Sequence, residues 1–254
     1  MIGKFEYQAG KVLAYNDFGV PGGFPVVVQH GSIASIKDTA LLEELGRRAR
    51  VICIARPGYG ESSPFILNSF LEYGKLAAKL TRELGIGEFD ILSSSAGAPY
   101  GYALARACAG KARNIYVYSG TPALYDEVIQ KNWPYPVVKE MTIEESQKTA
   151  YEVFFAHIPE SDKARNDVKD SMANNCFGEG QNLRIRFKDW GFTLPEISSK
   201  VYMQHSRKDG VIPYQLAVRT AELLRNCELE LLEEGSHFSA EGYKAFVGSV
   251  VFSS

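Results

Sequence analysis

Residues 93–97, Ser-Ser-Ser-Ala-Gly, have the residue types and the setting of a nucleophilic serine. The apolar run 89–92 precedes them, and a small-residue helical pattern over 98–109 follows. A tight turn between a strand and a helix projects one serine hydroxyl from the sheet. The same turn aims the helix N-terminus and the next backbone N–H groups at one point. A hydroxyl at that point could attack a carbonyl carbon, and the N–H groups could stabilise the resulting oxyanion.

Steric reasoning selects Ser95 among the three serines. Such a turn is so tight that the residues two before and two after the nucleophile must be small. For Ser95 these residues are Ser93 and Gly97. Moving the nucleophile back by one or two residues would put Leu92 or Ile91 at the first place, where a large side chain clashes. We therefore expect Ser95 to be the nucleophile, in a strained backbone conformation.

An acid and a base follow in the order that a Ser-Asp-His triad requires in this setting. Asp209 lies just beyond a strand-like run at 200–204, and His237 just beyond another at 228–232. In an open α/β sheet, ligand chemistry gathers at the carboxyl ends of the strands. We expect His237 to be the general base for Ser95 and Asp209 to hold its tautomer.

Three neighbouring residues compete for these roles. His205 ends the 200–204 run and could rival His237 as the base, but it precedes Asp209, and the order requires the base after the acid. Glu233 and Glu234 are alternatives to Asp209, although both stand at a strand end just before the histidine.

The elements that must position these residues alternate along the chain. Strand-like runs alternate with helical patterns over 38–48, 69–84, 213–225 and 239–251. This alternation predicts an α/β fold with a mostly parallel sheet covered by helices on both faces. Seven strand-like runs are found, at 11–15, 25–29, 51–55, 89–92, 114–119, 200–204 and 228–232.

One segment interrupts the alternation. Between residue 120 and about 195 the sequence shows helical patterns at 123–132, 142–156, 161–174 and 183–189. Thr142 and Glu145 have the spacing of a capping box. We expect a core domain of residues 1–120 and 196–254, with residues 121–195 inserted as a helical cap over the catalytic edge. A cap would shape the pocket and exclude water.

Composition limits the other possibilities. The 254 residues suit one large domain, and a net charge of −2 without long charge runs argues against nucleic acid or membranes as partners. No cofactor or metal motif is visible, so we expect neither. The four scattered cysteines, with no C-x-x-C spacing and no signal-peptide pattern at the start, predict a reduced, cytoplasmic protein.

The ordered set of motifs resembles the α/β-hydrolase fold superfamily, in its capped, epoxide-hydrolase-like and esterase-like branch. The matching stretches are residues 30–32 (HGS), 56–62 (RPGYGES), 93–97 (SSSAG), 206–213 (SRKDGVIP) and 235–238 (GSHF). Ser93 and Ser206 stand where the superfamily often has glycine, and both replacements are small. The resemblance covers nearly the whole chain.

The resemblance implies an α/β-hydrolase fold and acyl transfer by the triad. Its oxyanion donors would be the backbone N–H groups of Ala96, which follows the nucleophile, and of Ser32, with Ile33 as the competitor. Haloalkane dehalogenases and epoxide hydrolases of this fold attack with aspartate, so Ser95 argues against their alkyl-enzyme route.

The leading hypothesis is a serine hydrolase acting on a small ester or related acyl substrate through an acyl-enzyme. Two alternatives remain, because one fold hosts many functions. One is a ligand-binding or sensing protein with a vestigial triad. The other is a hydroxynitrile-lyase-type enzyme that uses the triad as a base. The sequence does not fix the oligomeric state.

Overall fold

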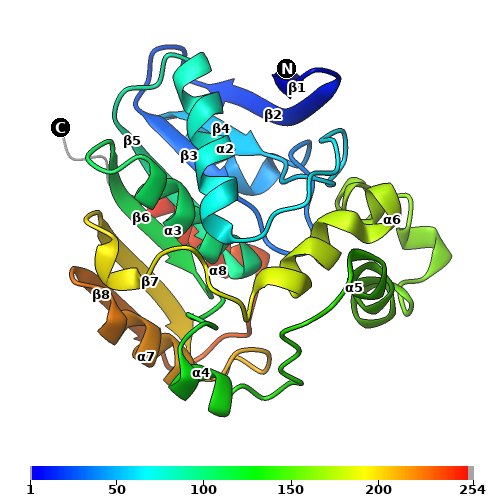
Figure 1. The fold of residues 1–254 in the computed structure, drawn as a ribbon. Helices are drawn as coiled ribbons and strands as arrows, with labels where there is room; N and C mark the ends of the chain where they lie inside the picture. The colour runs from blue at the N-terminus through cyan, green and yellow to red at the C-terminus, as the bar shows by residue number, and fades with distance from the viewer. Residues whose placement is uncertain (1, 251–254) are drawn as a thin grey trace.

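A computed structural model describes residues 2–250. One eight-stranded sheet forms the centre of the molecule, in the order β1-β2-β4-β3-β5-β6-β7-β8 (Figure 1). The strands are β1 (Ile2–Gln8), β2 (Lys11–Gly19), β3 (Pro25–Gln29), β4 (Arg50–Ile54), β5 (Phe89–Ser94), β6 (Ala112–Tyr118), β7 (Lys200–Ser206) and β8 (Cys227–Leu232).

The sheet is mostly parallel, as predicted. Strands β4, β3, β5, β6, β7 and β8 run parallel, and β1 and β2 add antiparallel pairs at one edge. The apolar runs of β3 and β5 are almost entirely buried, because helices cover both faces of the sheet centre. The sequence reading missed β1, an edge strand in which exposed and half-buried residues alternate.

Helices cover both faces of the sheet, and each face has its own apolar cluster between the helices and the strands. On one face α2 (Phe70–Glu83), α3 (Ala98–Ala107) and α7 (Tyr214–Leu223) pack against the strands. On the other face α1 (Glu43–Gly46) and α8 (Ala240–Gly248) do so. The remaining helices are α4 (Glu127–Lys131), α5 (Ile143–Ala150) and α6 (Asn166–Ile185), with short 3-10 or π segments at 40–42, 95–97, 151–155, 160–162 and 194–196.

The segment between β6 and β7 contains no strand among the described residues, in line with the predicted helical insertion. Its middle part, with α5 and α6, stands to one side of the sheet (Figure 1) and has a small apolar cluster of its own that includes Phe155 and Val168. Its two ends behave differently, because Leu124, Trp190 and Leu194 pack into the main core. A cap limited to residues 121–195 therefore remains a proposal.

Helix α6 differs from the predicted pair of helices at 161–174 and 183–189. It runs over Asn166–Ile185 but is broken by three successive left-handed residues, Asn174, Asn175 and Cys176. Asparagine tolerates this conformation better than most residues. The Gln147 side chain also donates to the carbonyls of Asn174 and Asn175, at 2.9 Å each. Both halves of α6 contact the loops that follow β3 and β4, since Asp170 accepts from the Ser35 hydroxyl and Glu179 accepts from the Tyr59 hydroxyl.

Candidate active site

Ser95 lies in the tight turn between β5 and α3. Its φ of 46° is in the left-handed region, which is strained for a serine, so the predicted strain is confirmed. Ser95 is the first residue of the 3-10 helix η2 (Ser95–Gly97), which leads into α3. The Thr121 N–H donates to the Ser95 carbonyl at 2.9 Å and so ties this turn to the segment that follows β6.

Gly97 is required by the close approach of the neighbouring strand. A Cβ atom at this position would lie 2.2 Å from the Gln29 carbonyl oxygen and 2.7 Å from the His30 carbonyl oxygen. Both atoms belong to the backbone and cannot move independently. The small residue predicted two positions after the nucleophile is therefore required because Gly97 contacts the end of β3.

We expect Gly97→Ala to lower the free energy of unfolding by about 1–3 kcal/mol, because the added methyl group overpacks this contact. Urea denaturation measures the loss. Gly87→Ala is the matched control, since a Cβ atom at Gly87 meets nothing within 4 Å. Equal stability of the two variants would contradict the close approach.

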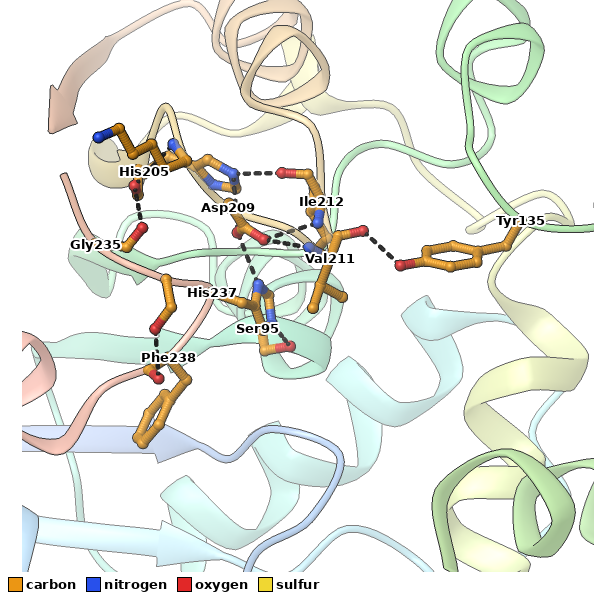
Figure 2. A network of polar contacts seen from close by, with 12 residues as sticks. Ser95, Tyr135, His205, Asp209, Val211, Ile212, Gly235, His237 and Phe238 are labelled. Atoms are coloured by element: carbon orange, nitrogen blue, oxygen red, sulfur yellow. Dashed lines mark hydrogen bonds and ion pairs between the residues drawn. The ribbon is translucent and has the colours of Figure 1, made fainter. Parts of the chain in front are cut away.

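The three residues selected from the sequence meet in one hydrogen-bonded chain (Figure 2). Ser95 Oγ lies 2.8 Å from His237 Nε2, and His237 Nδ1 lies 2.8 Å from Asp209 Oδ2. Each residue comes from a different loop at the same edge of the sheet. This distance geometry is that of a nucleophile, a base and an orienting acid.

The Asp209 carboxylate is held by donors on both of its oxygens. Oδ1 accepts the backbone N–H groups of Val211 and Ile212, each at 2.8 Å, while Oδ2 faces His237 and His205. Burial alone would raise the pKa of Asp209. The hydrogen bonds from the two histidines and Ile212 outweigh burial and hold that pKa well below its usual range. Asp209 is thus a fixed, ionised acceptor.

His205, the rival base, lies on the opposite side of the acid from Ser95. Its Nε2 is 2.9 Å from the Ile212 carbonyl and 3.2 Å from Asp209 Oδ2. Both partners are acceptors, so Nε2 carries the proton. The His205 side chain is buried, and within residues 2–250 it makes no hydrogen bond to Ser95. His237, and not His205, therefore lies beside the serine hydroxyl.

The loop formed by His30, Gly31 and Ser32 passes beside Ser95. A Cβ atom at Gly31 would lie 3.6 Å from Ser95 Cβ, so its backbone comes close to the serine. The buried Arg56 guanidinium donates to the carbonyls of His30 and of Gly31, the latter at 2.9 Å. Arg56 therefore fixes the direction of two peptide groups in the loop.

His30 supports the same loop and has no free nitrogen. Its Nδ1 contacts the Gly31 carbonyl at 2.8 Å, and its Nε2 accepts the Arg56 backbone N–H at 3.3 Å. Burial, reinforced by the Arg56 charge, lowers the pKa of His30 well below its ordinary value. His30 is therefore a neutral structural residue with Nδ1 protonated.

A buried polar network that the sequence reading missed joins this loop to α6. Glu179 accepts from the Tyr59 hydroxyl at 2.8 Å, from the Ser32 hydroxyl at 3.2 Å and from the Asn182 amide at 3.2 Å. The Tyr59 hydroxyl in turn accepts from Arg56 at 3.1 Å. Burial raises the pKa of Glu179, and the charge of Arg56 opposes that rise.

We expect Tyr59→Phe to lower the free energy of unfolding by about 1–3 kcal/mol, because the buried Glu179 carboxylate loses a donor that no water replaces. Tyr135→Phe removes a hydroxyl of the same kind from an exposed site. That control should change stability by less than about 0.5 kcal/mol. Thermal unfolding of both variants measures the difference, and a Tyr59→Phe protein as stable as the control would refute the role given to the network.

Four apolar or aromatic side chains close in sequence or by contact to the three residues are exposed. Val211 is near Asp209 and Phe238 is next to His237 in the sequence, Ile33 follows Ser32, and Tyr135 lies in the segment before α5. The Tyr135 hydroxyl donates to the Val211 carbonyl at 3.0 Å (Figure 2).

Two features are absent from residues 2–250, a metal-binding cluster and a membrane-spanning helix. No group of three or more His, Cys, Asp or Glu side chains is arranged to hold a metal ion. None of the helices in the same range has the length and apolar composition needed to cross a membrane.

Comparisons with known proteins find likeness in structure only. No family model and no curated protein matches the sequence. The structure is similar to an α/β-hydrolase enzyme, MGS-M2, from a Medee basin deep-sea metagenome library, with 18% identity, 99% of each chain covered and a TM-score of 0.70. An esterase from Exiguobacterium antarcticum matches with 20% identity over 98% of this chain and 100% of its own, at a TM-score of 0.69.

A bromoperoxidase from Bacillus anthracis matches with 18% identity, covering 92% of this chain and 91% of its own, at a TM-score of 0.69. The likeness spans nearly the whole chain in all three comparisons. Together with the topology of the sheet, it identifies this chain as a protein of the α/β-hydrolase fold.

Proposed function

We propose that the protein is a serine hydrolase that cleaves a small ester or related acyl substrate. Ser95 is the nucleophile, His237 the general base and Asp209 the residue that orients the imidazole. The observation that carries this proposal is the continuous hydrogen-bonded chain Ser95–His237–Asp209, with 2.8 Å at both contacts. The esterase and hydrolase names of structurally similar proteins agree with it.

The reaction proceeds in two acyl-transfer steps. His237 Nε2 takes the proton of Ser95 as Oγ attacks the carbonyl carbon, and then gives that proton to the leaving alkoxide. The acyl-enzyme that remains is attacked by water, which His237 activates in the same way. Asp209 stays ionised and stabilises the imidazolium formed in each step.

The oxyanion of each tetrahedral intermediate needs two fixed donors. The Ala96 N–H follows the nucleophile at the start of η2, where a backbone N–H has no partner within its own helix. The Ser32 N–H lies in the loop beside Ser95, and Arg56 fixes the carbonyls of the two preceding residues. We propose Ala96 and Ser32 as the two donors, with the Ile33 N–H as the competitor for the second place.

Two other functions suit the same fold. A ligand-binding protein would not need a base within hydrogen-bonding distance of the serine. A hydroxynitrile lyase would use His237 as a base and form no acyl-enzyme. The short contact between Ser95 and His237 favours an enzyme over a binding protein, and formation of an acyl-enzyme distinguishes the hydrolase from the lyase. A cytoplasmic location is also proposed, since all four cysteines are free thiols.

Pre-steady-state hydrolysis of p-nitrophenyl acetate separates these functions. A hydrolase that forms an acyl-enzyme releases p-nitrophenolate either in a burst stoichiometric with enzyme or in a linear phase that requires Ser95. Acetyl-Ser95 should be detectable by mass spectrometry after an acid quench. Release that is unchanged in Ser95→Ala, or an absence of turnover with any ester, would overturn the proposal.

A further inference from the structure

Arg186, at the C-terminal end of α6, is a half-buried cation without an acceptor. Within residues 2–250 its side chain makes no ion pair and no hydrogen bond, and its Nε atom is buried without a partner. Burial lowers the pKa of this guanidinium, and the nearby Glu179 only opposes that shift. A donor that is buried without an acceptor costs free energy unless something binds it.

Trp133 supplies a second unpartnered donor at the same place. Its indole Nε1 is also buried with no hydrogen-bond partner. Arg186 Cζ lies 5.8 Å from the centre of the Trp133 ring and 4.8 Å from that of Phe187. These rings stabilise the cation, but they accept no ordinary hydrogen bond from it. A guanidinium and an indole N–H therefore stand together without an acceptor.

The charges around this pair leave a positive excess. Within residues 2–250, Glu179 is the carboxylate whose charge acts on both the buried Arg56 and the half-buried Arg186. Its oxygens are already engaged by Tyr59, Ser32 and Asn182 rather than by either arginine. One acid cannot neutralise two arginines, so the cluster has room for one more negative charge.

Contacts of Arg186 connect this pair of donors to the loop formed by His30, Gly31 and Ser32. Glu179, the electrostatic neighbour of Arg186, accepts from the Ser32 hydroxyl at 3.2 Å. Ser32 follows Gly31, whose backbone lies beside Ser95. Arg186 is therefore linked through Glu179 and Ser32 to the loop beside Ser95.

Contacts of Trp133 connect the same place to the loop that contains Asp209 and Val211. The Trp133 and Tyr135 rings are 5.4 Å apart, and the Tyr135 hydroxyl donates to the Val211 carbonyl (Figure 2). The Val211 N–H donates to Asp209, the partner of His237. Trp133 is thereby linked through Tyr135 and Val211 to the residue that orients His237.

We propose that Arg186 and Trp133 bind a carboxylate carried by the substrate, so that the preferred esters are half-esters of short dicarboxylic acids. This inference rests on the proposed function and narrows its substrate class. A planar carboxylate accepts two parallel N–H bonds from a guanidinium and has lone pairs left for the indole. The exposed side chains of Val211 and Tyr135 would contact the remainder of the substrate.

Paired substrates test the inference. The p-nitrophenyl half-esters of succinate, glutarate and adipate are compared with neutral p-nitrophenyl esters of the same acyl-chain length. We expect kcat/KM to favour at least one half-ester by about 10–100-fold over its neutral counterpart. Arg186→Gln should remove that preference and leave the neutral esters within about twofold, whereas Trp133→Phe should lower it by about 3–10-fold.

Lys148→Gln is the matched control, because it removes the same charge from a side chain of α5 that is 77% exposed. It should leave both substrate classes unchanged. Arg186→Lys keeps the charge but not the planar fork and should retain part of the preference, so it serves if Arg186→Gln fails to fold. An equal loss on charged and neutral esters, or no half-ester preferred by the unmodified enzyme, would overturn the inference.

Calorimetric binding of succinate, glutarate and adipate separates this inference from the proposed function. We expect the preferred diacid to bind the Ser95→Ala protein and to bind at least about 10-fold more weakly when Arg186→Gln is added. If the unmodified protein has no esterase activity but diacid binding depends on Arg186, the anion site is supported and the hydrolase is rejected. Esterase activity without such binding would retain the hydrolase and reject the anion site.

Discussion

Replacing Ser95 or His237 by alanine should each lower kcat for p-nitrophenyl acetate by roughly 10⁴–10⁶-fold. Ser95→Ala removes the atom that attacks the carbonyl. His237→Ala leaves a hydroxyl that cannot lose its proton at neutral pH. Since the two residues act as one unit across a 2.8 Å contact, their losses should not add.

The double variant Ser95→Ala with His237→Ala should therefore have nearly the kcat of Ser95→Ala alone. Measuring kcat for both single variants and the double, with folding checked by circular dichroism, completes the cycle. Losses that multiply would mean that the two residues act independently. A fully active Ser95→Ala protein would exclude acyl transfer by this serine and favour the binding-protein alternative.

Asp209→Asn should lower kcat by about 10⁴-fold while the protein stays folded. The structure gives the reason. The N–H groups of Val211 and Ile212 point at Oδ1, so the asparagine oxygen must take that position. Its NH₂ group then faces His237 Nδ1, which has to become an acceptor. The imidazole proton moves to Nε2, the atom that should receive the proton of Ser95.

The control for this change is Asp162→Asn, the same substitution at a side chain that is 45% exposed in the inserted segment. It should leave kcat unchanged. The steady-state assay uses saturating p-nitrophenyl acetate and reports kcat and KM separately. A loss in Asp209→Asn that appears in KM alone would mean that the acid supports substrate binding and not the tautomer of His237.

The positions of the three reacting residues could be predicted because their signals are local. Ser95 stands in a strand–turn–helix pattern, and Asp209 and His237 each follow a strand-like run. Parallel strands bring their carboxyl ends to one edge, so topology alone places such residues together. The geometric prediction that His237 approaches Ser95 on one side and Asp209 on the other agrees with the structure.

The supporting residues could not be predicted because their partners are far apart in the sequence. Tyr59 and Glu179 are separated by 120 positions, and nothing near Glu179 marks it as a buried acceptor. The edge strand β1 was missed because it is only half-buried. The ends of the insertion could not be assigned, since Trp190 packs into the main core although it follows the helices of the insertion.

Labelling with a fluorophosphonate tests the central claim most directly, because this reagent phosphonylates a serine only when a neighbouring base activates it. Intact-mass spectrometry with peptide mapping should find one adduct per chain, on Ser95. The adduct should be absent from Ser95→Ala and strongly slowed in His237→Ala. An unlabelled protein, or an adduct on another serine, would contradict the assignment of Ser95 as the activated nucleophile.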